Sequence, residues 1–266
     1  MSTINGTALI TGASTGIGAV YADRLAKRGL NLILVARDAA RMEVLAERLR
    51  GETGVGIEIL PADLTIDADV TRIEERLTRG DVTLLLNNAG MSLNGSVLEN
   101  GPAELVRIIA LNVTAPTRLA AAAAKVFVGK GDGAIVNISS VLAVAPEIFD
   151  GVYSGTKAFV LNLSQALSAQ LADKGVYTQA VLPGATRTEI WERSGKDVDA
   201  FPADFVMAVD DLVDAALLGF DRRETITIPS LADERQWSAM QDARLAMRPN
   251  LSKRDVAARY REAITV

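Results

Sequence analysis

Short apolar runs alternate along the chain with longer segments in which charged residues recur at helical spacing. Segments such as 39–50 and 67–79 carry charges on one side only, which predicts amphipathic helices. The apolar runs between them are too short for helices, and they are typical of strands buried on both faces of a parallel sheet. Seven runs are predicted as strands: 8–10, 32–35, 57–60, 84–86, 135–138, 176–181 and 225–228.

This alternation predicts an α/β fold, a Rossmann-like doubly wound parallel seven-stranded sheet with six main helices on both faces. The sequence has no internal repeat and no low-complexity linker, so a single domain over residues 1–266 is predicted. Residues 189–210 mix aromatic and charged residues and are predicted to form a substrate flap. Residues 229–266 are predicted to be a C-terminal extension with two short helices, around 233–245 and 252–263.

Composition excludes several kinds of chemistry. The 266 residues include no histidine and no cysteine, which excludes disulfides, thiol chemistry and the usual zinc ligands, and no metal site is predicted. The net charge of −5 gives no general reason to bind nucleic acid or an anionic membrane. No signal-peptide pattern begins the sequence and no uninterrupted apolar stretch reaches about 18 residues, so we expect a cytoplasmic protein without a membrane partner.

A glycine-rich turn lies between the first strand and the helix that follows it. The sequence "ALITGASTGIG" places glycines at positions 12, 16 and 18. Glycine allows a tight turn and close approach of the backbone to a pyrophosphate, and a helix N-terminus presents unpaired N–H groups to it. The strand–turn–helix context therefore predicts a dinucleotide site, and an ordinary strand–helix turn is the alternative.

Arg37 lies 19 positions after Gly18, where an acidic residue usually binds the ribose 2′-hydroxyl. An arginine can instead pair with a 2′-phosphate, so NADP(H) is favoured over NAD(H) as the cofactor. The hydroxyls of Ser14 and Thr15 are further candidate donors. The alternative is a solvated arginine whose field is weakened by the neighbouring Asp38.

Tyr153 and Lys157 lie four residues apart on a predicted helix over 151–174, so they share one face. Such pairs are common on helix surfaces. A nearby ammonium group is expected to lower the pKa of a tyrosine, which would make an acid/base pair possible without histidine. Ser140 strengthens this interpretation, because it follows the strand predicted at 135–138, at the end where ligands bind in open α/β sheets.

Several further motifs follow the glycine-rich turn in a fixed order. They are "ADL" at 62–64, "NNAG" at 87–90, Asn112 in "LNV", Ser140 in "NISSV", "YSGTK" at 153–157 and "PGATRT" at 183–188. Together with "TGASTGIG", this ordered set resembles the classical short-chain dehydrogenase/reductase family. The resemblance covers residues 7–188.

The resemblance implies roles for individual residues. It implies that Asn112 holds a water of a proton relay, that Ser140 binds the substrate oxygen, and that Tyr153 and Lys157 are the acid/base pair and also contact the cofactor. It further implies that Asp63 and Leu64 flank the adenine, Asn87 and Ala89 the adenosine ribose, and Thr188 the nicotinamide carboxamide. The remaining predicted cofactor-binding residues are Gly12, Ser14, Thr15, Gly16, Ile17, Gly18, Arg37, Gly90, Pro183, Gly184 and Thr186.

The function predicted from these residues is that of an NADPH-preferring oxidoreductase that interconverts a ketone or aldehyde and an alcohol. Its predicted partner is a small carbonyl or alcohol substrate, with no nucleic acid. The alternative is a non-catalytic NADP(H)-binding regulatory or scaffold protein of the same fold. The family resemblance also implies a homodimer or homotetramer.

Overall fold

The protein was analysed as a computed structural model that describes residues 6–95, 97–148 and 151–261. The chain divides into two compact units, Met1–Pro229 and Ser230–Val266. The division falls where the C-terminal extension was predicted to begin. The assignment of the whole chain to a single domain stays a prediction.

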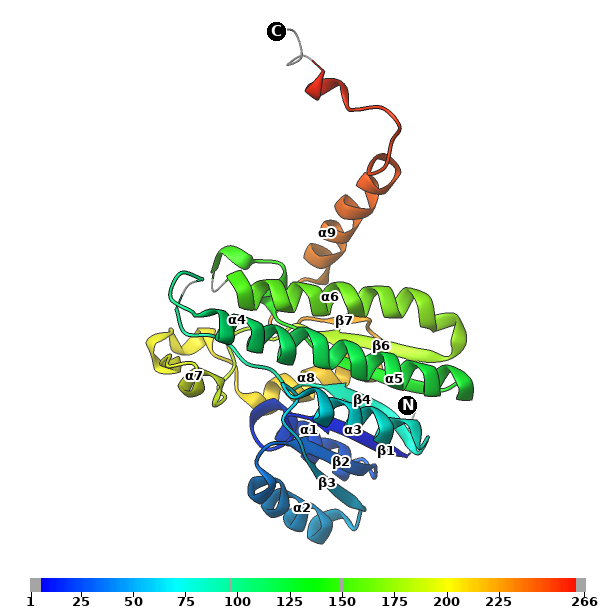
Figure 1. The fold of residues 1–266 in the computed structure, drawn as a ribbon, viewed down its shortest axis with the longest axis vertical. Helices are drawn as coiled ribbons and strands as arrows, with labels where there is room; N and C mark the ends of the chain where they lie inside the picture. Colours follow the sequence, from blue (N-terminus) through cyan, green and yellow to red (C-terminus); the bar gives the residue numbers. More distant parts are fainter. Residues whose placement is uncertain (1–5, 96, 149–150, 262–266) are drawn as a thin grey trace. The chain divides into compact units, whose positions relative to one another are not determined.

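The first unit contains a seven-stranded sheet whose neighbouring strands are all parallel, in the order β3-β2-β1-β4-β5-β6-β7. The α/β doubly wound fold is therefore confirmed (Figure 1). The last strand is two residues long, shorter than the predicted 225–228. The strands are β1 Thr7–Thr11, β2 Asn31–Ala36, β3 Ile57–Pro61, β4 Val82–Asn87, β5 Gly133–Ile138, β6 Val176–Val181 and β7 Ile226–Thr227.

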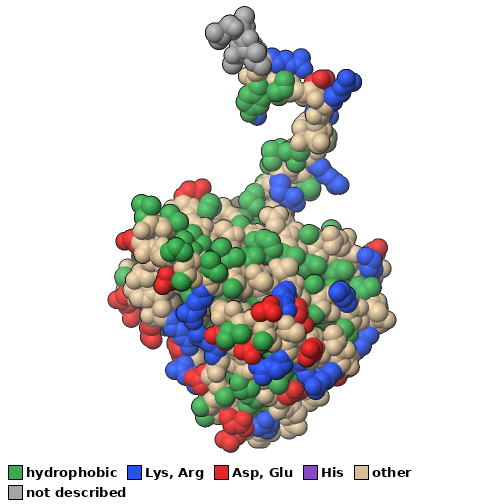
Figure 2. All heavy atoms as spheres, viewed as in Figure 1, with side chains coloured by type: hydrophobic (Ala, Val, Ile, Leu, Met, Phe, Trp, Pro, Cys, Tyr) green, Lys and Arg blue, Asp and Glu red, His purple; other side chains and the backbone are tan. Residues whose placement is uncertain are grey.

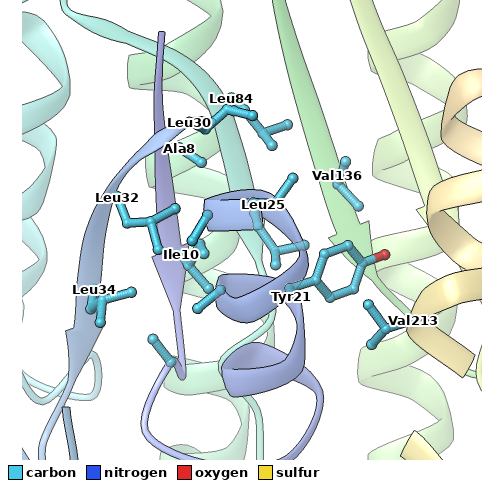
Figure 3. Close-up of a cluster of buried hydrophobic side chains, with 14 of the residues drawn as sticks. Ala8, Ile10, Tyr21, Leu25, Leu30, Leu32, Leu34, Leu84, Val136 and Val213 are labelled. Atoms are coloured by element: carbon cyan, nitrogen blue, oxygen red, sulfur yellow. The ribbon is translucent and has the colours of Figure 1, made fainter. Parts of the chain in front are cut away.

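Helices cover both faces of the sheet because successive side chains of each strand point to opposite faces. Ala8 and Ile10 of β1 lie in a core shared with α1, α2 and α8, whereas Leu9 between them lies in a second core with α3 and α5. Figure 3 shows the first core, with the Tyr21 ring among aliphatic side chains. The helices are α1 Gly16–Lys27, α2 Ala39–Thr53, α3 Asp67–Thr78, α4 Pro102–Ile109, α5 Ala115–Lys130, α6 Gly151–Leu171, α7 Ile190–Arg193, α8 Val209–Asp221 and α9 Glu234–Met247.

The second unit contains α9, where one of the two tail helices was predicted. Asp233 caps this helix, since its side chain accepts a hydrogen bond from the N–H of Arg235. The other predicted helix, around 252–263, is wrong as far as residue 261, because that part contains only the 3-10 turn Ala258–Tyr260. Arg254 and Asp255 offer no apolar stripe there that could stabilise a longer helix by packing.

The stretch Pro102–Lys130 is helical throughout, since a π-helical turn at Ala110–Thr114 joins α4 to α5. Within the described residues, this is one helix long and apolar enough to cross a membrane, judged by length and composition only. Core helices of soluble proteins pass the same test, and α5 packs against α3, β4 and β5. The expected absence of a membrane partner and the cytoplasmic location stay predictions.

Candidate active site

The predicted site residues that follow strands lie at one edge of the sheet, because parallel strands all end there. The glycine-rich turn follows β1, and "NNAG" begins at the last residue of β4, the strand next to β1. Between these two strands the order of the sheet reverses, and such a switch point is where ligands bind in open α/β sheets. Ser140 and Pro183 follow β5 and β6 along the same edge.

The glycine-rich turn leaves no room for larger side chains. Gly12 has a φ of +66°, and a Cβ added there would lie 2.9 Å from the Cα of Ala89. A Cβ on Gly18 would lie 2.3 Å from the carbonyl oxygen of Gly12. Gly16 also has a positive φ, and it faces Thr188, whose Cγ2 atom would lie 3.2 Å from an added Cβ. The turn is therefore packed between the "NNAG" and "PGATRT" segments.

Two residues that the sequence analysis did not single out hold this turn in place. The buried Thr11 hydroxyl accepts hydrogen bonds from the N–H groups of Asn88 and Ala89, each at 3.0 Å. In return, the Asn88 amide donates to the carbonyl oxygens of Thr11 and Gly12 at 2.9 and 3.2 Å. Both residues stand inside quoted motifs, but no local pattern indicates that their side chains meet.

Arg37 is exposed at the end of β2, and its charge reaches the Asp63 carboxylate. The neighbouring Asp38 carboxylate is engaged in capping α2, because it accepts a hydrogen bond from the N–H of Arg41 at 3.0 Å. Thr15 occupies the N-cap position of α1 without capping it. Its hydroxyl instead accepts a hydrogen bond from Arg193 Nη2 at 3.4 Å, near the start of α1.

Asp63 and Leu64 are held differently. Burial alone would raise the pKa of the Asp63 carboxyl group, but hydrogen bonds from Thr65 and the charges of Arg37 and Arg107 lower it. Asp63 is therefore an ionised acceptor at neutral pH. Leu64 is buried in the core cluster that includes α3 and α5.

The Asn87 side chain lies inside the fold. Its amide donates to the carbonyl oxygen of Pro116 at 3.2 Å and to Asn137 Oδ1 at 2.9 Å. Its own Oδ1 atom is buried without a hydrogen-bond partner among the described residues. These two hydrogen bonds connect β4 to β5 and α5. The predicted contact between Asn87 and the adenosine ribose would therefore use Oδ1 or the backbone.

Ser140, Tyr153 and Lys157 come together at this edge of the sheet. Tyr153 shares a hydrogen bond with Ser140, and Lys157 Nζ lies 5.6 Å from the centre of the Tyr153 ring. Lys157 Nζ also donates to the carbonyl oxygen of Ile138 at 3.0 Å. The adjacent Ser139 points elsewhere, donating to the carbonyl oxygen of Lys157 at 2.7 Å. The end of β5 thus holds α6 in register, with Ser140 toward the tyrosine.

The predicted lowering of the Tyr153 pKa by Lys157 is wrong for this structure. Burial raises the pKa of Tyr153 to about 12, and the hydrogen bond with Ser140 offsets only part of that rise. Burial also lowers the pKa of Lys157 to about 8. Removing both groups from water disfavours their charged forms, and this desolvation is the largest cause of both shifts.

Asn112 lies in the π-helical turn Ala110–Thr114 and is buried. Its side chain accepts from the N–H of Met91 and donates to the Met91 carbonyl oxygen, both at 2.9 Å, and it also donates to Thr156 at 3.1 Å. A Cβ on Gly90 would lie 3.4 Å from both Asn112 Oδ1 and Lys157 Nζ. Asn112 therefore lies beside the lysine, and π-helical turns are frequent at functional sites.

The "PGATRT" segment closes the edge next to Ser140. The Pro183 carbonyl oxygen accepts from the N–H of Val141 at 2.9 Å and from Ser140 Oγ at 3.5 Å. Thr186 donates to the carbonyl oxygen of Gly184 at 3.0 Å, and Thr188 donates to that of Thr186 at 3.5 Å. These bonds shape a turn that carries Thr188 to the glycine-rich turn.

The predicted flap begins with α7. Phe201 stacks on Phe205 with ring centres 5.9 Å apart, and its other neighbour is Trp191, whose ring is tilted and 5.2 Å away. Trp191 Nε1 donates to the carbonyl oxygen of Thr186 at 2.7 Å. The flap is thus attached directly to the segment that carries Thr188.

The residues present fit a dinucleotide. A turn without room for Cβ atoms runs into the N-terminus of α1, where the Thr15 side chain does not cap the helix, and Asn87 Oδ1 has no hydrogen-bond partner among the described residues. Ser14, Ile17, Ala89 and Gly184 lie along the same strand ends. No group of three or more His, Cys, Asp or Glu in the described parts of the chain is arranged to hold a metal ion.

Comparison with known proteins identifies the family. Residues 6–199 match the family model described as short chain dehydrogenase. The chain belongs to the short-chain dehydrogenase family. Its members are NAD(P)-dependent oxidoreductases, which confirms the resemblance drawn from the motifs.

Solved structures of this family superpose on nearly the whole chain. A short-chain dehydrogenase from Sphingobium yanoikuyae in complex with NADPH has a TM-score of 0.94 and 53% identity, and covers 96% of this chain and 100% of its own. The bulky-bulky ketone specific alcohol dehydrogenase from Comamonas testosteroni has a TM-score of 0.89 and 48% identity, and covers 96% and 98%.

Curated relatives in the short-chain dehydrogenase family are more distant. Human 17-beta-hydroxysteroid dehydrogenase type 3 is 35% identical over 74% of this chain and 64% of its own length. Mouse very-long-chain 3-oxoacyl-CoA reductase is 32% identical over 69% and 60%. The chain thus spans less than two thirds of the length of these relatives.

Proposed function

We propose that this protein is an NADPH-preferring carbonyl reductase that interconverts a ketone or aldehyde and an alcohol, with Tyr153 as the acid/base. The observation that carries the proposal is the hydrogen bond between Tyr153 and Ser140, with Lys157 5.6 Å from the tyrosine ring, at the edge of the sheet where the glycine-rich turn lies. A binding module would need none of this acid/base geometry.

In the proposed reaction, the nicotinamide supplies or accepts the hydride. Ser140 positions the substrate oxygen by hydrogen bonding, and Tyr153 gives its proton to that oxygen as the carbonyl becomes an alcohol. In the opposite direction Tyr153 takes the alcohol proton. A pKa of about 12 keeps Tyr153 protonated at neutral pH, which supports the reductive direction. Lys157 and Asn112, which both lie near Gly90, are proposed to return a proton to Tyr153 after the reduction.

The preference for NADP(H) is supported by charge. Arg37 is exposed at the end of β2, where a carboxylate would repel a 2′-phosphate, and Asp38 is engaged in capping α2. The Sphingobium yanoikuyae relative, at 53% identity, forms a complex with NADPH. We expect Arg37→Ala to reduce the preference for NADPH over NADH.

We further propose that the substrate is a neutral ketone with bulky groups on both sides. Two arginines of the flap region have carboxylate partners: Arg187, just before the flap, is bonded to Asp199 at 2.7 Å, and Arg193 is bonded to Glu189 at 2.6 Å. The aromatic side chains of the flap provide apolar surface, and the Comamonas testosteroni relative is named for bulky-bulky ketones.

The test is to follow nicotinamide absorbance with NADPH and with NADH, using hexanophenone, acetophenone and a 3-oxoacyl thioester. Faster oxidation of NADPH with hexanophenone than with acetophenone supports the whole proposal. Faster turnover with NADH overturns the cofactor preference alone. Absence of turnover in a protein that binds NADPH supports the non-catalytic alternative.

A homodimer or homotetramer remains part of the proposal. Val106, Ile109 and Phe159 of α4 and α6 expose large apolar side chains. The face in Figure 2 shows hydrophobic side chains gathered over this region. Light scattering after gel filtration should find an oligomer that Phe159→Asp dissociates, whereas Val44→Asp, on exposed α2, should leave it intact. A monomeric wild-type chain would refute this part of the proposal.

A further inference from the structure

Glu189, at the start of the flap, connects the flap to α2 near the glycine-rich turn. Both oxygens of its carboxylate accept hydrogen bonds from Arg41 Nη1 of α2 at 2.8 Å. One of them also accepts from Arg193 Nη2 of α7 at 2.6 Å. The same Arg193 Nη2 lies 3.4 Å from the hydroxyl of Thr15, which belongs to the glycine-rich turn. Glu189 thus holds a flap arginine over the start of α1.

The other end of α7 is attached to the substrate side. Lys196 Nζ donates to the carbonyl oxygen of Leu93 at 2.7 Å, and a Cβ on Gly195 would lie 2.8 Å from the Asn94 amide nitrogen. Between these points, Trp191 is bonded to Thr186. The backbone N–H of Lys196 donates to the carbonyl oxygen of Trp191 at 2.8 Å, so Arg193 and Lys196 belong to one short hydrogen-bonded segment.

The charged side chains around Glu189 indicate which kind of ligand this arrangement could bind. Arg193, which lies beside Thr15, and Arg41 of α2 both pair with the single carboxylate of Glu189. Arg41 also lies 3.4 Å from Asp38, and Arg37 adds an exposed positive charge at the end of β2. A phosphate monoester carries a charge of about −1.5 to −2 at neutral pH and accepts several charge-assisted hydrogen bonds. The Thr15 hydroxyl does not cap α1 and lies 3.4 Å from Arg193 Nη2, so a phosphate bound at Thr15 would contact the flap.

We propose that Arg193 of the flap is a further ligand of the coenzyme 2′-phosphate, positioned by Glu189, and that the phosphate thereby holds the flap closed. This inference rests on the proposed preference for NADP(H). Arg193 then determines specificity from the flap, in addition to Arg37 at the end of β2. The side chains of Arg193 and Glu189 are 52% and 37% exposed, so water and salt weaken the interaction and its effect is moderate.

The experiment uses fragments that cannot turn over. The chain has two tryptophans, so Trp237→Phe leaves Trp191 of α7 as the only one. In this background, adenosine 2′,5′-bisphosphate and 5′-AMP are titrated by calorimetry, and acrylamide quenching of Trp191 is measured with each. We expect Arg193→Ala to weaken binding of the bisphosphate about fivefold, with AMP unchanged. The bisphosphate, but not AMP, should protect Trp191, and Arg193→Ala should remove that protection.

Matched variants make the outcome specific. Arg187→Ala removes an arginine just before the flap that pairs with Asp199. It should leave the affinities for the bisphosphate and for AMP within about twofold of the parent. Arg193→Lys keeps the charge and should recover part of the bisphosphate affinity. Equal affinities of Arg193→Ala and its parent for the bisphosphate, or equal losses for both ligands, overturn the inference. If Arg37→Ala nevertheless weakens bisphosphate binding, the proposed NADP(H) preference survives. A parent that binds AMP as tightly as the bisphosphate refutes both.

Discussion

Lys157 Nζ lies 5.6 Å from the centre of the Tyr153 ring, and the two residues are one helical turn apart on α6. Burial sets the properties of both, since it raises the pKa of Tyr153 to about 12 and lowers that of Lys157 to about 8. The tyrosine is therefore a proton donor over the whole neutral range. The lysine, bonded to the Ile138 carbonyl oxygen, loses its charge under mildly alkaline conditions.

Tyr153→Phe should lower the rate of carbonyl reduction at least about a hundredfold, because it removes the proposed proton donor. NADPH affinity should change by less than about threefold, since the phenyl ring keeps the packing of α6. Stopped-flow hydride transfer and calorimetric titration with NADPH measure the two effects. Substantial turnover in this variant refutes the assignment of Tyr153.

Lys157→Met should change how stability depends on pH. The folded pKa of Lys157, about 8, lies below its ordinary value of 10.5. Between these values the unfolded chain binds more protons, so raising the pH stabilises the wild-type fold. Relative to Lys157→Met, the wild-type free energy of unfolding should rise by about 1–2 kcal/mol from pH 7.5 to 9.5.

Urea denaturation of the wild type and Lys157→Met at several pH values measures this difference without substrate. The range ends at pH 9.5 because Tyr153, with its raised pKa, begins to work in the opposite direction above about pH 10. A constant difference between the two proteins would mean that Lys157 titrates normally in the fold.

Thr11→Val should destabilise the protein by about 1–3 kcal/mol, because it leaves the half-buried N–H groups of Asn88 and Ala89 without their acceptor. Thr11→Ser keeps the hydroxyl and should recover most of the loss. Thermal unfolding and NADPH titration are the measurements. If valine and serine behave alike, the hydroxyl does not hold the glycine-rich turn.

Asp23→Asn should destabilise the packing of α1 against α2 in a pH-dependent way. Burial alone would raise the pKa of Asp23, but hydrogen bonds from Lys27, Arg48 and Arg24 lower it to about 2. The stabilisation is present above the ordinary value of 3.8 and is lost as the pH falls toward 2. We expect a difference of about 1–2 kcal/mol at pH 6 that shrinks below pH 4, measured by urea denaturation. A difference that persists at pH 2.5 would point to packing instead.

The sequence by itself determined the sheet, the order of the motifs and the position of the glycine-rich turn. These are local properties, since strand burial follows from runs of apolar residues and Gly12 and Gly16 meet a need for positive φ within one turn. The spacing of Tyr153 and Lys157 on one helical face is local in the same sense. The helix predicted around 252–263 is wrong as far as residue 261, because that part has no apolar stripe that could stabilise a helix by packing.

Only the tertiary structure decided how distant side chains meet. Thr11 bonds to residues 77 and 78 positions away, and Arg41 bonds to Glu189 at a separation of 148. The direction of the Tyr153 pKa shift also depended on the fold, because desolvation is set by everything packed around the hydroxyl and not by the neighbouring lysine alone. Chain order can place these groups at the same edge of the sheet, but contact distances and exclusion of water arise only when the layers pack.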